Sequence, residues 1–282
     1  MSKRPAICAG PRRFYPSDPR ELREVVEGYL ASGGTTSPGT VGLVAPHAGY
    51  VFSGATAGQS FAAVRGLRFD RVVVMGPSHF VPFDGVHVTR CNAFETPLGR
   101  VPVDLDFVRA LEEHHDLVAE WPQVEAREHC IEVELPFLQV ALGEFRLVPI
   151  VVANQGRQSA RVIAEALSRT MASEGGSTLV VASCDLYHGP GSSLALSRSR
   201  LAAEAMGGND ADRFLDGIEH GRFMACGPGA VAATMWLAGE AGADHAEVRG
   251  VTTSFEVYPV SEDYVVGYSS VIFREGTPDS SS

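Results

Sequence analysis

Short apolar runs alternate with amphipathic segments along most of the chain. The runs have the length and β-branched content of buried strands, and the segments between them carry apolar residues at helical spacing. The predicted strands are Val41–Pro46, Arg71–Met75, Val86–Thr89, Leu147–Val152, Thr178–Ala182, Val248–Val257 and Val265–Phe273. The predicted helices span about residues 18–31, 54–65, 104–115, 131–142, 157–172, 195–206 and 228–240. This alternation predicts an α/β fold with a mostly parallel central sheet and helices on both faces.

The last two predicted strands lie close together in the sequence. Such a pair is expected to be antiparallel and to lie at one end of the sheet. The sequence shows no internal repeat and no linker-like change of composition. We therefore expect residues 1–276 to form a single domain and the tail 277–282 to be disordered.

The charge and composition exclude several classes of protein. The chain has 282 residues, with 23 Lys and Arg against 34 Asp and Glu, and a net charge of −11. An acidic chain without a basic run is unsuited to nucleic acid or to an anionic membrane surface. No apolar stretch reaches the roughly 18–20 residues that span a bilayer, and the N-terminus lacks the apolar core of a secretory signal. The five cysteines are scattered singly, so we expect a reduced, cytoplasmic protein without a disulfide framework.

Chemically capable side chains follow the predicted strands. His47 follows VGLVAP, His79 follows RVVVMGPS, and Asp185 and His188 follow TLVVASC. Cys226 lies in ACGPG, directly before a predicted helix. Ligands of open α/β sheets bind at the carboxyl ends of the strands, so we expect these groups to converge there.

The residue types in this set suit a metal ion. A helix N-terminus lowers the pKa of a thiol, so Cys226 is expected to be a thiolate, which serves equally as a metal ligand or a nucleophile. Two imidazoles and one thiolate predict a mononuclear metal site of His47, His79 and Cys226. Five further histidines are interpreted as surface or packing residues: His87, His114, His115, His220 and His245.

Two further segments have both a structural and a functional interpretation. Residues 128–136 begin a helix, where Glu128, Glu132 and Glu134 are expected to serve the helix dipole and solvent, while His129 is placed to enter the crevice as a proton donor. Residues 53–58 are interpreted as a Ser53 helix cap followed by small residues for tight helix–sheet packing, rather than as an anion site.

The chain resembles a known family over nearly its whole length. The motifs AGPRRFYPSDPREL, PHAGYVFSG, VMGPSH, FETPLGRVPVD, EHCIEVELPFLQ, SCDLYHG and ACGPGAV follow one another in the order found in the Memo family, known in prokaryotes as AmmeMemoRadiSam system protein B. That resemblance implies a LigB-like fold, shared with the class III extradiol dioxygenases. Those enzymes open catechol rings with Fe(II) held by two His and one Glu.

The resemblance also assigns roles to particular residues. His47 and His79 match the metal-binding histidines, and Cys226 stands where the dioxygenases have Glu. His188 matches their acid/base histidine, and His129 matches a histidine near the substrate. Asp185 is expected to orient His188, and Tyr50 to hydrogen-bond the substrate together with His129.

Three segments depart from the family pattern. SCDLYHG replaces the usual SSD and SHYG, TTSFEV replaces a Tyr-Ser-x-Ser-Ser segment, and YVVGYSS replaces SVSYAA. The expected metal positions are intact, whereas the wall of the pocket differs from that of the family. The sequence therefore does not identify the substrate.

These observations favour a non-haem Fe(II) oxygenase that acts on a small phenolic or catechol-like substrate with O2. Copper or zinc would also suit a site with a thiolate. The alternatives are a Cys226–His188–Asp185 hydrolase, a zinc hydrolase, and a non-catalytic scaffold that binds metal or a phosphorylated peptide. A blue-copper protein is disfavoured because the alternation of helices and strands does not suit a β-sandwich.

Overall fold

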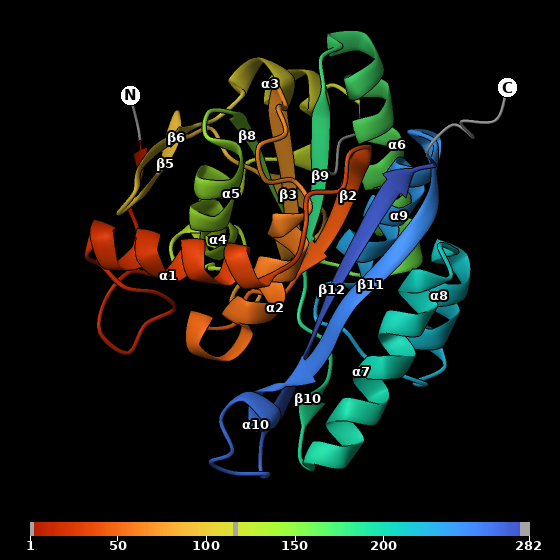
Figure 1. The fold of residues 1–282 in the computed structure, drawn as a ribbon. Coiled ribbons are helices and arrows are strands. Elements are labelled where there is room, and N and C mark those ends of the chain that lie inside the picture. The colour runs from red at the N-terminus through yellow and green to blue at the C-terminus, as the bar shows by residue number, and fades with distance from the viewer. Residues whose placement is uncertain (1–2, 115–117, 277–282) are drawn as a thin grey trace, which may run out of the picture.

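The computed structural model describes residues 3–114 and 118–276. In these residues the strands form a large mixed sheet and a small three-stranded sheet (Figure 1). The large sheet has the order β10-β12-β2-β9-β3-β8-β4-β7, with β11 paired to β12, and the small sheet has the order β1-β5-β6. This arrangement confirms the predicted α/β fold.

The strands and helices have the following bounds. The strands are β1 Lys3–Arg4, β2 Thr40–Ala45, β3 Arg71–Pro77, β4 Val86–Val88, β5 Ala93–Thr96, β6 Gly99–Pro102, β7 Val118–Ala119, β8 Arg146–Val152, β9 Thr178–Ser183, β10 His188–Gly189, β11 Ala243–Thr253 and β12 Val265–Glu275. The helices are α1 Pro19–Ser32, α2 Tyr50–Ala62, α3 Leu105–Glu112, α4 Pro122–Glu125, the 3₁₀ helix η1 Glu132–Glu134, α5 Leu135–Leu142, α6 Arg157–Glu174, α7 Ser192–Gly207, α8 Ala211–Glu219, α9 Pro228–Glu240 and α10 Ser254–Val257.

Four neighbouring strands in the middle of the large sheet run parallel. β9 pairs in parallel with both β2 and β3, and β3 pairs in parallel with β8. The carboxyl ends of these strands therefore lie along one edge. The long strand β12 is antiparallel to β2 and to β11, so the expected antiparallel pair of late strands is present at one side of the parallel core.

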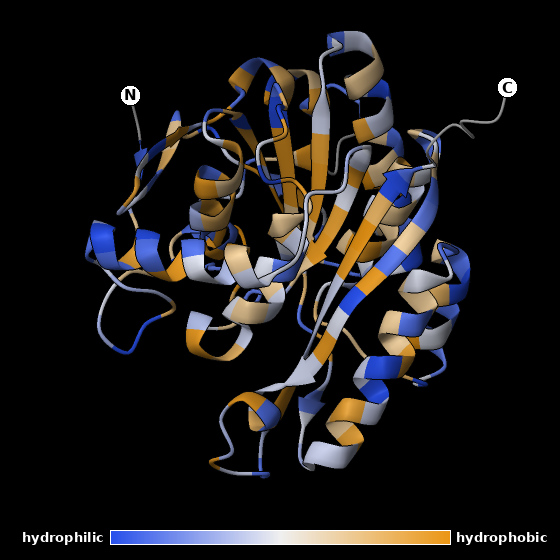
Figure 2. Ribbon diagram, in the orientation of Figure 1, coloured by the Kyte–Doolittle hydropathy of each residue, from blue (hydrophilic) through white to orange (hydrophobic). Residues whose placement is uncertain are grey.

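Helices cover both faces of the parallel strands. α1, α2 and α5 lie on one face, and α6 and α9 lie on the other, where they pack together (Figure 1). The strands between them are the most apolar part of the chain, and polar residues lie on the outer sides of the helices (Figure 2). One continuous core cluster includes residues from both layers and the sheet. Burial of apolar surface on both sides explains why these strands are continuous apolar runs.

Several boundaries differ from the sequence prediction. α2 begins at Tyr50, earlier than predicted, so Ser53 lies within the helix and its hydroxyl donates to the carbonyl of Ala48 instead of capping the helix. The predicted strand Val248–Val257 ends at Thr253, where α10 begins. The short helix α8 was missed altogether. His115 and the tail 277–282 lie outside the described residues.

The small residues of α2 serve close packing, although against a helix as well as the sheet. A Cβ atom added to Gly58 would lie 2.6 Å from the carbonyl oxygen of Tyr29 in α1. Such a distance is shorter than real side chains allow, so glycine lets the two helices approach closely. The anion-site interpretation is excluded by the bounds of α2, because Gly58 lies inside the helix and not at its N-terminus.

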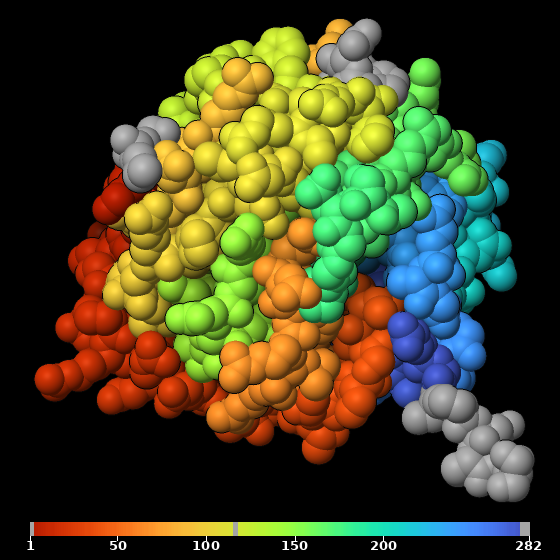
Figure 3. All heavy atoms as spheres, turned by 90° about the horizontal axis from the view of Figure 1, so that it is seen from above, coloured from red at the N-terminus to blue at the C-terminus, as the bar shows by residue number. Residues whose placement is uncertain are grey.

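The loops that lead into the parallel strands lie together at the end of the molecule opposite the carboxyl ends of these strands. Figure 3 shows this face, on which the segments before β3, β8 and β9 gather. The backbone N–H of Arg146 donates to the carbonyl of Asp70, and the backbone N–H of Ser177 donates to the carboxylate of Asp70.

None of the described helices is both long and apolar enough to cross a membrane.

Candidate metal centre

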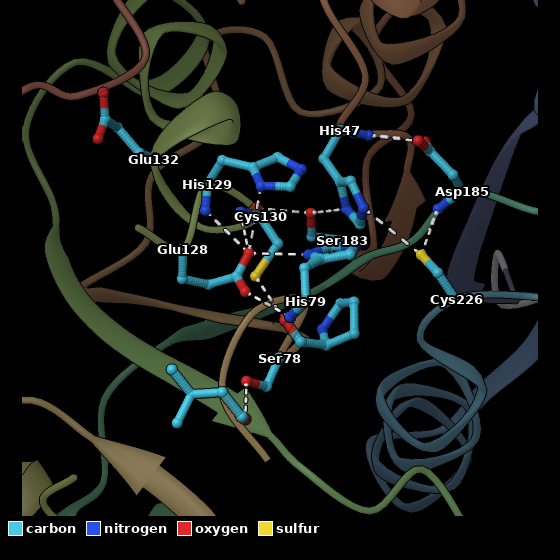
Figure 4. Close-up of polar contacts among 12 residues, drawn as sticks. His47, Ser78, His79, Glu128, His129, Cys130, Glu132, Ser183, Asp185 and Cys226 are labelled. Atoms are coloured by element: carbon cyan, nitrogen blue, oxygen red, sulfur yellow. Dashed lines mark hydrogen bonds and ion pairs between the residues drawn. The ribbon is translucent and has the colours of Figure 1, made fainter. Parts of the chain in front are cut away.

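Three side chains from distant parts of the chain converge at the carboxyl ends of the parallel strands (Figure 4). His47 follows β2, His79 follows β3, and Cys226 precedes α9. Each offers a ligand atom that lies within 4.8 Å of the other two. Because β9 lies between β2 and β3 in the sheet, the two histidines approach one another across the end of β9. Open α/β sheets bind ligands at this end of their strands.

The ring of His47 is buried and held by Ser183. Its Nδ1 lies 2.8 Å from Oγ of Ser183, which leaves Nε2 as the available ring nitrogen. That Nε2 lies 3.4 Å from Sγ of Cys226. Burial, together with the nearby His79, lowers the pKa of His47 to about 3. The imidazole is therefore neutral at pH 7, as a metal ligand must be.

His79 is held by Glu128. The backbone N–H of His79 donates to Oε2 of Glu128 over 2.7 Å, and Nδ1 lies 2.9 Å from Oε1. The same Oε1 accepts the backbone N–H groups of His129 and Cys130. Burial opposes the ionisation of Glu128, but the hydrogen bonds from His79 outweigh it and hold the pKa of this carboxyl well below its ordinary range. A carboxylate at Nδ1 leaves Nε2 of His79 free for a ligand.

Cys226 is tied to the segment that follows β9. Its Sγ accepts the backbone N–H of Asp185 over 3.2 Å, and Sγ of Cys184 accepts the N–H of Gly227 over the same distance. Burial, followed by the neighbouring Cys184 and Asp185, raises the pKa of Cys226 well above its ordinary value. Among the protein groups alone, burial therefore favours the thiol over the expected thiolate. A metal cation would supply the missing positive charge.

This donor set fits one transition-metal ion. Both imidazoles have Nδ1 engaged by a fixed partner and Nε2 free, which is the usual state of histidines that bind metals. Two nitrogens and one sulfur suit Fe(II), copper or zinc, whereas magnesium and calcium prefer oxygen ligands. Three protein ligands also leave coordination positions for a substrate.

His129 lies beside this centre. Its ring stacks on His79 at 4.5 Å and on Phe14 at 4.5 Å, and it meets His47 edge-on. Its Nδ1 is buried without a hydrogen-bond partner among the described residues. Burial, with His47 and His79 nearby, lowers the pKa of His129 to about 3. Nδ1 of His129 lies 3.4 Å from Oε1 of Glu128, so Nε2 is the ring nitrogen left for a ligand.

His79, Glu128 and His129 also lie within 4.8 Å of one another. This second group does not form a separate metal site. The carboxylate of Glu128 already accepts N–H groups from His79, His129 and Cys130, and His79 is shared with the first group. A metal at Glu128 would have to displace these hydrogen bonds.

Comparison with known proteins identifies the family. The profile described as Memo-like protein matches residues 4–272. A MEMO1 family protein from Methanopyrus kandleri is 35% identical to this chain, and the alignment covers 98% of the chain and 100% of the relative. The chain belongs to the Memo family. MEMO1 family proteins from Ignicoccus hospitalis and Nitrosopumilus maritimus are 34% and 31% identical, and each alignment covers 97% of the chain and at least 99% of the relative.

The acid/base pair expected in this Memo protein is arranged differently in the structure. Asp185 accepts the backbone N–H of His47 over 2.9 Å, whereas Nδ1 of His188 lies 2.9 Å from the carbonyl of Leu186. Between these two described residues there is no hydrogen bond, so Asp185 does not orient the ring of His188. Burial raises the pKa of Asp185 to about 6. The backbone of Leu186 orients His188 and leaves its Nε2 available.

Tyr50 does not join the group of histidines. Its hydroxyl donates to the carbonyl of Val133 over 2.7 Å, and its ring packs against Tyr15 and Phe137. Because its only hydrogen is engaged, the expected hydrogen bond from Tyr50 to a substrate is not supported. Tyr50 lies in the first turn of α2, which directs its side chain into the core.

Three glutamates have roles that the sequence pattern did not predict. Glu128, Glu132 and Glu134 were expected to face solvent, yet all are buried in this Memo protein. Glu132 accepts hydrogen bonds from the N-terminal segment, including the guanidinium of Arg4 at 2.9 Å and the hydroxyl of Tyr15 at 2.7 Å. It thereby fixes the segment that stacks Phe14 on His129. The signal was three carboxylates in a segment otherwise apolar enough to be core.

Proposed function

We propose that this Memo protein binds one transition-metal ion, with Fe(II) as the first choice of metal, and that it oxidises a small phenolic or catechol-like substrate with O2. The convergence of His47, His79 and Cys226, with both histidines fixed through Nδ1, carries the proposal. Bound Fe(II) would activate O2 beside the substrate. In an extradiol cleavage a ring C–C bond breaks and both oxygen atoms enter the product, so no further reductant is required.

The residues around the centre suit a phenolic ring. Phe14 and Phe80 both contact the ring of His129, and Tyr264 lies 6.2 Å from the ring of His188. Aromatic side chains favour an aromatic ligand through stacked or edge-on contacts.

His188 can take the proton of the substrate hydroxyl at Nε2, since its Nδ1 is already engaged. His129, whose Nδ1 lies 3.4 Å from Oε1 of Glu128, can hydrogen-bond the substrate oxygen through Nε2. Each histidine then has a distinct task at a stated atom.

The hydrolase alternative has weaker support. A Cys–His–Asp arrangement needs an activated thiol and an aspartate that orients the histidine. The pKa of Cys226 is raised, and Asp185 bonds to the backbone of His47 instead of to His188. It would also leave the paired rings of His47 and His79 without a function.

The deciding experiment is metal analysis of anaerobically purified protein. We expect about one iron per chain. The variants H47A, H79A and C226S should lose it, while the control H245A, at an exposed histidine, should keep it. Copper would indicate oxidation chemistry other than ring cleavage, and zinc would indicate hydrolysis. A protein that neither contains nor accepts a metal would contradict the proposal.

Activity is tested separately, by O2 consumption with a panel of catechols. Consumption that depends on iron and on the substrate supports the oxygenase. Tight iron binding without any oxidation would instead favour the non-catalytic scaffold.

A further inference from the structure

The hydroxyl of Ser183 lies at the centre of a buried network behind His47. Its Oγ lies 2.8 Å from Nδ1 of His47, 2.6 Å from the carbonyl oxygen of Cys130 and 2.7 Å from Oε1 of Glu134 (Figure 4 shows the first two of these partners). All four residues are buried. A serine hydroxyl has one hydrogen to donate and two lone pairs with which to accept.

Counting hydrogens assigns the donor in each contact. The carbonyl of Cys130 can only accept, and Ser183 has a single hydrogen, so all three contacts can be hydrogen bonds only if that hydrogen points to Cys130. Oγ must then accept from both His47 and Glu134. His47 can donate because Nδ1 carries the ring hydrogen. Glu134 can donate only if its carboxyl group is protonated.

The second oxygen of Glu134 leads to the same conclusion. Oε2 is buried and has no hydrogen-bond partner among the described residues. An ionised carboxylate with a bare oxygen is costly in the interior, whereas a neutral carbonyl-type oxygen costs much less.

Among the described residues, no positively charged group acts on Glu134. The titratable groups that it faces are Asp185, Tyr50 and Cys130, which repel a negative charge or are neutral. Burial is the main cause that raises the pKa of Glu134 well above its ordinary value, and Asp185 adds to it.

We propose that Glu134 is a neutral carboxylic acid that acts as a positioning residue for His47. Its hydrogen occupies one lone pair of Ser183 and the hydrogen of Ser183 is directed to Cys130, so Ser183 can only accept from Nδ1 of His47, and Nε2 stays bare for the metal. The part concerning the metal rests on the proposed function. A neutral Glu134 also keeps the charges of the site matched, since the thiolate of a metal-bound Cys226 and the carboxylate of Glu128 already balance a divalent ion.

Infrared spectroscopy tests the protonation of Glu134 without any metal. At neutral pH we expect the carbonyl stretching band of a protonated carboxyl group in the wild type and in E144Q, a control at an exposed glutamate. The band should be absent in E134Q. A wild-type spectrum without this band, or a band that persists in E134Q, would overturn the proposal.

Metal affinity tests the positioning role. In E134Q an amide N–H can donate to Ser183 in place of the acid, so affinity should stay close to that of the wild type. In E134L and S183A the chain of hydrogen bonds is broken, and affinity should fall about tenfold or more. Equal affinities in all four proteins would contradict the positioning role. If the wild type binds no metal but the infrared band is present, the proposed function fails while the assignment of Glu134 stands.

Discussion

Nδ1 of His79 lies 2.9 Å from Oε1 of Glu128, a direct carboxylate–imidazole contact. The ring of the other histidine, His47, is linked to the carboxyl group of Glu134 through Ser183. The two rings therefore have different hydrogen-bond partners: the carboxylate of Glu128 holds His79, and the neutral network of Ser183 and Glu134 holds His47. Partners of this kind govern how strongly a histidine binds a metal.

The first prediction concerns Glu128. In E128Q the amide cannot accept from both the backbone N–H and Nδ1 of His79, because one of its two ends is a donor. We expect metal affinity to fall by about 10- to 100-fold, measured by competition with a chelator. E125Q is the matched control, since Glu125 lies 3.1 Å from Nε2 of the buried His87 outside the centre. Equal losses in the two variants would contradict a specific role for Glu128.

The second prediction concerns pH and Glu125. Burial opposes its ionisation, but the hydrogen bonds from His87, Thr89 and Cys91 outweigh burial and lower its pKa. A carboxyl group with a lowered pKa stabilises the fold above its unfolded pKa of about 4.3, and this contribution is lost as the pH falls through the folded pKa. E125Q should therefore have a lower urea midpoint than the wild type at pH 7, and the gap should close in acid. A constant gap across the pH range would argue against this linkage.

The third prediction separates metal binding from turnover at His188. H188Q removes the proton acceptor but leaves the three proposed ligands intact. We expect an unchanged metal content, with turnover of a catechol substrate reduced by about 10²- to 10⁴-fold. Metal analysis and O2 consumption on the same sample provide the measurement. A variant that loses its metal would show that His188 contributes to the centre itself.

The fourth prediction concerns the contact between α1 and α2. A Cβ atom at Gly58 would collide with the carbonyl of Tyr29, so G58A should destabilise the fold by about 1–3 kcal/mol. Gly28 in α1 has no atom within 4 Å of the position of a Cβ, and G28A should be neutral or stabilising by up to about 1 kcal/mol. Thermal unfolding of the two variants checks the pair. Similar effects at both positions would exclude close packing as the cause.

Much of the fold and the candidate site followed from local patterns in the sequence. Apolar runs such as Arg71–Met75 predicted the strands of a parallel sheet, because strands buried on both faces must be apolar throughout. His47, His79 and Cys226 were found because each lies where a strand ends or a helix begins, and the carboxyl ends of parallel strands share one edge. The length and apolar composition of the strand segments were therefore enough to predict that these three side chains lie close together.

Only the tertiary structure decided what surrounds these ligands. Glu134 follows a helical pattern and carries a charge at pH 7 as a free side chain, so local rules placed it in solvent. Its burial depends on the end of β9, 49 residues later in the chain, which brings Ser183 to its carboxyl group. The surroundings of Cys226 were unforeseen for the same reason, because burial by distant segments raises the pKa of its thiol. Local spacing determines which residues can meet, whereas burial and hydrogen bonds between distant segments determine their protonation and hence their chemistry.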